Sequence, residues 1–253
     1  MFNPLDYPFL VLVVSLCMLW VSASIGVWLR KRTQKPGEER HQDLEIILGA
    51  TLTLLGLIIG FTFSMAVSRY DQRKNYEEQE ANAIGTEYVR ADLFPPGDAA
   101  KVRALLKSYL EQRIIGYKVR DRRRIQQTNA EIARLQGEMW TAVVAPATAQ
   151  PTQVAALVVS GMNDVLNSQG YTQAAWWNRI PTAAWVLLIL ISVFCNLLIG
   201  YDAHGRSAFL LLILPIALSI SLFLIADIDS PHGGVIRVKP QNLESLADSL
   251  HSQ

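Results

Sequence analysis

Long runs of apolar residues with almost no polar interruption stand near both ends of the chain. Residues 9–29 and 46–67 form two such runs, and residues 183–200 and 209–225 form two more. A helix needs about 20 apolar residues to cross the hydrocarbon core of a bilayer. The pattern therefore predicts four transmembrane helices in two pairs. For the second pair, a buried helical hairpin is the alternative.

The first run is predicted to be a retained membrane anchor. No Lys or Arg precedes it, so it lacks the basic start of a signal peptide, and it ends in Arg30-Lys31-Arg32 in place of a small-residue cleavage site. The numbers of Lys and Arg residues near the two membrane faces are equal, so charge alone predicts no orientation.

The region between the two pairs is predicted to be helical. The second run continues without proline as far as Phe94, which predicts one long helix that leaves the membrane and ends at Pro95-Pro96. Asp98 is the predicted N-cap of the next helix. Apolar spacing predicts further helices over 129–144 and 151–167, joined by a link at 145–150. The predicted fold class is all-α.

This organisation divides the chain into four parts. Residues 1–67 carry the first pair of spans (9–29 and 46–67), 68–182 form the extramembrane domain, 183–225 carry the second pair (183–200 and 209–225), and 226–253 form an acidic turn and tail.

Composition narrows the function. Among 253 residues, 51% are hydrophobic and the net charge is +1, so no basic field exists that could bind nucleic acid. Two isolated cysteines and four scattered histidines give no zinc spacing, and no catalytic motif is present. No cofactor and no enzymatic activity are expected. Asp227 and Asp229 are weak metal candidates, and the alternative is a membrane-surface turn with capping carboxylates.

The four spans contain no Asp, Glu, Lys, Arg or His. Proton-coupled transporters and pumps generally need such a group at membrane depth. This absence argues against them and leaves a passive pore or a non-transporting anchor. A pore without charge can still operate, because apolar rings gate by dewetting.

The second span carries the candidate pore residues. Thr53, Leu57 and Phe61 are four residues apart and share one helical face, which would give an apolar neck around an oligomer axis. Gly56 and Gly60 form a small-xxx-small pair where another helix could approach closely. Ordinary helix packing is the alternative for all five residues.

Charged residues follow directly after this span. Arg69, Arg73 and Lys74 precede Glu77, Glu78 and Glu80. Charges of both signs at this spacing predict a solvated helix face. Around an oligomer axis the alternative is a wet vestibule, for which Arg69, Arg73 and Lys74 are the candidates.

Three segments resemble bestrophins, and most closely the bacterial bestrophin-like family, within a superfamily of ion channels. They are Leu54–Arg73 with its glycine-aromatic pair, Gln79–Leu93, and the acidic turn Asp227–Asn242, in which His232 stands where an aromatic residue is usual. The order of two spans, helical domain, two spans and turn is also similar. The resemblance implies a homopentamer in the inner (plasma) membrane, with Thr53, Leu57 and Phe61 in the neck. It also implies that the large domain and both termini are cytoplasmic.

These features leave three hypotheses for the function of the protein. The leading hypothesis is a passive homo-oligomeric channel whose partners are the lipid bilayer and small inorganic ions. The second is a non-conducting membrane-anchored interaction or sensor protein that acts through its helical domain. The third, a membrane enzyme, lacks a visible nucleophile or metal cluster.

Overall fold

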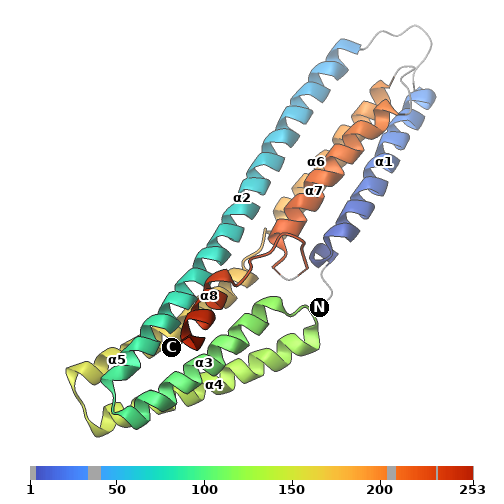
Figure 1. The fold of residues 1–253 in the computed structure, drawn as a ribbon. Helices are drawn as coiled ribbons and strands as arrows, with labels where there is room; N and C mark the ends of the chain where they lie inside the picture. The colour runs from blue at the N-terminus through green and yellow to red at the C-terminus, as the bar shows by residue number, and fades with distance from the viewer. Residues whose placement is uncertain (1–3, 34–40, 204–208, 232, 253) are drawn as a thin grey trace. The chain divides into compact units, whose positions relative to one another are not determined.

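The chain forms two compact helical units. The computed structural model describes residues 4–33, 41–203, 209–231 and 233–252, and in them it contains helices and no strands (Figure 1). One unit comprises Met1–Arg69 and Arg179–Arg237, and the other comprises Tyr70–Asn178 and Val238–Gln253. Helix α2, His41–Arg90, contributes residues to both. Residues 226–253, which were expected to form one acidic turn and tail, are divided between the two units at Arg237.

The membrane unit contains the predicted spans. After the short turn η1 (Pro4–Asp6), it is built from α1 (Pro8–Thr33), the first part of α2, α6 (Thr182–Asp202) and α7 (Leu210–Asp229). Among the described residues, four helical stretches are long and apolar enough to cross a membrane, and they contain the first three predicted runs and residues 211–225 of the fourth. Exposed apolar side chains such as Phe194 and Ile213 lie on α6 and α7. These side chains suit a lipid environment, and the four-span, all-α prediction is confirmed.

Two glycines allow α1 and α6 to touch through their backbones. A Cβ atom at Gly26 would collide with the Leu197 carbonyl oxygen, and one at Gly200 would collide with the Ala23 carbonyl oxygen. Beside this crossing, the Ser22 hydroxyl donates a hydrogen bond of 2.7 Å to the Val193 carbonyl. Lipid tails are as apolar as the helices, so the hydrophobic effect does not drive two helices together in a membrane. Small residues at the contact let the helices come close enough for van der Waals packing to stabilise the pair.

The extramembrane unit is built around the second part of α2. It contains η2 (Ala91–Leu93), α3 (Pro96–Lys118), α4 (Arg122–Ala149), α5 (Gln153–Trp177) and α8 (Gln241–His251). Helices α3 and α4 pack against each other, as do α4 and α5, and α8 packs on α3. Its core includes Ile84, Leu106, Met139 and Val158, all fully buried.

Two details predicted for this unit are wrong. Residues 145–150 are not a link, because α4 continues through Pro146 to Ala149. The proline removes one N–H donor and crowds the carbonyl four residues earlier, and this cost falls in the last turn, because only three residues of α4 follow it. Asp98 is not an N-cap, since α3 begins at Pro96, whose fixed φ suits a first helical position, and Asp98 falls inside the first turn.

The short helix α8 is held by a capping group from α2. Glu77 accepts hydrogen bonds from the backbone N–H groups of Asn242 (2.9 Å) and Leu243 (3.0 Å), and from Asn242 Nδ2 (2.6 Å). A carboxylate at a helix N-terminus satisfies free N–H groups and favours the helix dipole. Farther along, Lys107 Nζ donates to the Leu250 carbonyl (2.7 Å).

Candidate functional site

The membrane-spanning part of α2 has one buried side and one open side. The buried side is formed by Leu55, Thr62 and Ala66, which are at most 4% exposed. Their spacings of seven and four residues place them on one face of the helix. The three predicted neck residues lie on the open side. Thr53 is exposed, and Leu57 and Phe61 keep 53% and 65% of their surface accessible. Packing within a single chain therefore does not account for this face.

Hydroxyl groups on this span are satisfied within the helix. Thr53 Oγ1 donates to the Gly49 carbonyl at 2.8 Å, and Thr62 Oγ1 donates to the Ile58 carbonyl at the same distance. Such bonds to the carbonyl four residues earlier allow a hydroxyl to lie at membrane depth. On Thr53, which is exposed, the hydroxyl oxygen can still accept a hydrogen bond from the open side.

The two glycines predicted to pack helices face open space within the described part of the chain. A Cβ atom at Gly56 or Gly60 would meet no atom within 4 Å. Any close helix contact there would come from another copy, so the packing role stays a prediction.

The charged residues after the span are sorted by burial. Arg73, Glu77 and Glu80 are at most 2% exposed, so the predicted solvated face is wrong for them. Together with Ile84 and Glu87 they follow spacings of four and three residues, which place them on one side of α2. Of the vestibule candidates, Arg73 is thus buried, Arg69 is half-buried and Lys74 is exposed.

A buried ion pair explains why charge is tolerated on that side. Arg113 of α3 binds Glu80 through both Nε and Nη2, the second bond being 2.9 Å long. Thr172 of α5 also reaches Glu80 Oε2 (3.3 Å). Burial works against the charged Arg113, but the adjacent Glu80 outweighs it and raises the arginine pKa. Three helices are thereby linked through one carboxylate.

Sequence reasoning missed this pair, although a signal for it exists. Arg113 continues the apolar face of α3 formed by Leu106, Tyr109 and Leu110 at helical spacing. A single cation within an apolar face needs a buried partner. The charges on α2 at core spacing supply candidate partners.

The two aspartates of the acidic turn after α7 accept hydrogen bonds from backbone N–H groups. Asp227 accepts hydrogen bonds from the backbone N–H groups of Val235 (2.7 Å) and Ile236 (2.8 Å). Asp229 accepts from the backbone N–H of Ile180 (3.1 Å). Both aspartates are 1% exposed.

A basic residue also forms ion pairs at this turn. Arg179 forms ion pairs with Asp229 and with Asp6. These contacts match the alternative of a turn with capping carboxylates. In the described part of the chain, no group of three or more His, Cys, Asp or Glu side chains is arranged to hold a metal ion. His232 lies outside the described residues, as do Lys35, Arg40 and Arg206 of the membrane-flanking charges.

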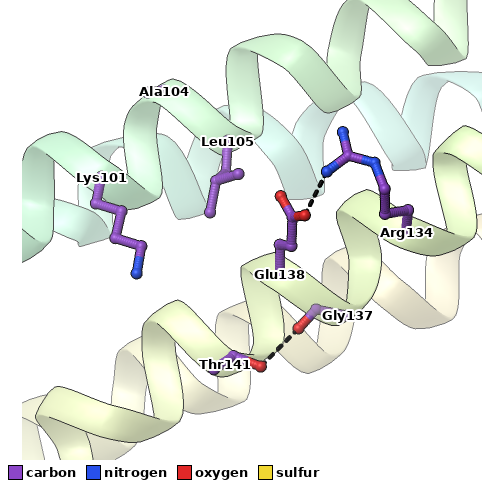
Figure 2. A pocket seen from close by; sticks show the side chains of 7 residues that line it. All are labelled: Lys101, Ala104, Leu105, Arg134, Gly137, Glu138 and Thr141. Carbon is purple, nitrogen blue, oxygen red and sulfur yellow. Dashed lines mark hydrogen bonds and ion pairs between the residues drawn. The ribbon is translucent and has the colours of Figure 1, made fainter.

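A shallow hollow of about 510 Å³ lies between α3 and α4 on the extramembrane unit (Figure 2). Its charged groups are Lys101, Arg134 and Glu138, and Arg134 is paired with Glu138 four residues along the same helix. Thr141 donates its hydroxyl proton to the Gly137 carbonyl (2.8 Å). These are ordinary interactions of an exposed helix face. They give the hollow no arrangement for chemistry.

These features define an α-helical integral membrane protein with an extramembrane unit built on the extension of one span. The chain belongs to the bestrophin-like family, because the family model described as Bestrophin-like domain matches residues 17–243.

Solved structures share this fold at low sequence identity. A variant of a bacterial Bestrophin homolog from Klebsiella pneumoniae is 12% identical, with a TM-score of 0.67 over 95% of this chain and 98% of that one. A variant structure described as a membrane protein is 11% identical, with a TM-score of 0.69 over 95% and 97%. A search of curated protein sequences gives no significant match.

Proposed function

We propose that the chain is one subunit of a passive ion channel, a homopentamer in which α2 of each copy lines the pore. Thr53, Leu57 and Phe61 form the apolar neck, which opens and closes by wetting and dewetting. The assembly lies in the plasma membrane, with the extramembrane unit and both termini in the cytoplasm. Membership of the bestrophin-like family supports this assignment.

One observation carries the proposal. The span of α2 buries Leu55, Thr62 and Ala66 against its own chain and leaves the neck face open. An open face of Leu and Phe side chains needs lipid or another copy to cover it. Five copies around an axis would instead bring Thr53, Leu57 and Phe61 together as stacked rings.

Ion flux through reconstituted protein tests the proposal. The purified full-length chain is placed in liposomes, and K⁺, Na⁺ and Cl⁻ fluxes are measured after its mass in detergent is determined. We expect an oligomer of five times the 28.2 kDa chain mass and measurable flux of at least one ion. Phe61→Ala should raise the flux several-fold, because removing the rings widens the neck.

Leu190→Ala provides the matched control. Leu190 on α6 is 49% exposed, so this variant removes a comparable apolar side chain from outside the proposed pore. Its flux should equal that of the unsubstituted protein. A monomer in detergent, or an oligomer silent to all three ions with Phe61→Ala also silent, would refute the channel and favour the non-conducting anchor.

A further inference from the structure

Glu87 differs from the other buried acids of α2. Its side chain is 0% exposed, as is that of Glu80, yet neither Glu87 oxygen has a hydrogen-bond partner among the described residues. Glu77 and Glu80 on the same side of the helix use their carboxylates fully, in the α8 cap and the Arg113 pair. An ionised carboxylate without hydrogen bonds is very costly to bury, whereas the neutral acid is much less so.

The surroundings of Glu87 are tightly packed. On α5, a Cβ atom at Gly161 would collide with Glu87 Oε2 and with a guanidinium nitrogen of Arg90. The charged groups that act on Glu87 are Arg90 on its own helix and Asp164 on α5. The nearby cation and anion oppose each other, so neither secures an ionised Glu87.

We propose that Glu87 is a proton-binding site of the extramembrane unit, occupied when α5 packs against α2 and emptied as that contact loosens. The ligand is a single proton. The inference concerns this unit alone, so it does not depend on whether the protein conducts ions.

The direction of the pKa shift agrees with the geometry. Burial, assisted by Asp164 and opposed by Arg90, raises the pKa of Glu87 from 4.5 to about 8. The folded chain therefore holds this proton more tightly than the unfolded chain. The stability that proton binding at Glu87 contributes to the fold is fully present below pH 4.5 and is lost progressively as the pH rises from there to about 8.

The test compares Glu87→Gln with the unsubstituted full-length protein in detergent. Infrared difference spectra should show a protonated-carboxyl band that titrates with a midpoint near pH 8 and is absent in the variant. Gln keeps the shape of the neutral acid and cannot ionise. Its melting temperature should therefore match that of the unsubstituted protein near pH 4.5 and exceed it by roughly 5 °C at pH 8.5.

Two further variants make the result decisive. Glu78→Gln, at an exposed position on the same helix, should leave the band and the pH profile of melting unchanged. Gly161→Ala should lower the midpoint or abolish the band, because its methyl group displaces the Glu87 carboxyl. The inference fails if the unsubstituted protein shows no such band above pH 6. It also fails if the melting profiles of the unsubstituted protein and Glu87→Gln coincide from pH 4.5 to 8.5.

Discussion

Three buried glutamates on one side of α2 meet three environments. Glu77 caps α8, Glu80 pairs with Arg113, and Glu87 has no hydrogen-bond partner in the part of the chain that the structure describes. A buried carboxylate must be paired, hydrogen-bonded or neutral, because uncompensated charge is too costly. The same residue type therefore acts as a helix cap, as half of an ion pair and as a proposed proton site.

The Glu80–Arg113 pair gives a prediction at this scale. Glu80→Leu should destabilise the protein by about 3–5 kcal/mol, because it leaves the Arg113 guanidinium buried without its partner. The double variant Glu80→Leu with Arg113→Met should recover much of that loss, since no charge then remains. Denaturant unfolding followed by circular dichroism measures both.

An exposed pair supplies the comparison. Glu244 and Lys118 form an ion pair at the surface, and Glu244→Leu should change stability by about 1 kcal/mol or less. A Glu80→Leu protein as stable as Glu244→Leu would show that the buried pair contributes little.

Among the elements, α1 and α6 depend on close backbone approach. Gly200→Ala should destabilise the membrane unit by about 1–3 kcal/mol, because its Cβ meets the Ala23 carbonyl, a backbone atom that cannot rotate away. Thermal unfolding in detergent measures the effect. Gly170→Ala on α5, where a Cβ meets nothing within 4 Å, should instead be neutral or stabilising by about 0.5–1 kcal/mol. Equal stability of the two variants would mean that the helices move apart without cost.

Element boundaries show where sequence patterns were sufficient. The continuous α2 helix was predictable because no proline interrupts the sequence from the span to Phe94. The short helix α8 was not predicted, since its cap, Glu77, lies far away in the sequence. Such a contact leaves no local signature around Asn242.

For the whole molecule, the decisive question is what covers the open face of α2. In a chain with Cys17→Ser, Phe61→Cys should form covalent dimers with a bifunctional maleimide in membranes, because neck residues of neighbouring copies lie close together and each copy then has one accessible thiol. The other native thiol, Cys195, is buried. Denaturing gel electrophoresis measures the products.

Leu55→Cys tests the opposite side of the same helix. Leu55 is 1% exposed within its own chain, so this variant should give no cross-linked species. Equal cross-linking from both positions, or none from Phe61→Cys, would contradict a shared axis lined by this face.

The sequence by itself determined the four spans, the all-α class and the long α2 helix, because hydrophobic run length and the absence of proline act locally along the chain. It also placed Thr53, Leu57 and Phe61 on one face. Only the tertiary structure decided which side of α2 is buried, since the charges after the span have the same local pattern whether they face water or a partner. The partners come from other helices: Arg113 pairs with Glu80, and the N-terminus of α8 at Asn242 is capped by Glu77. Gly161 of α5 lies against Glu87, where we propose that a proton is bound.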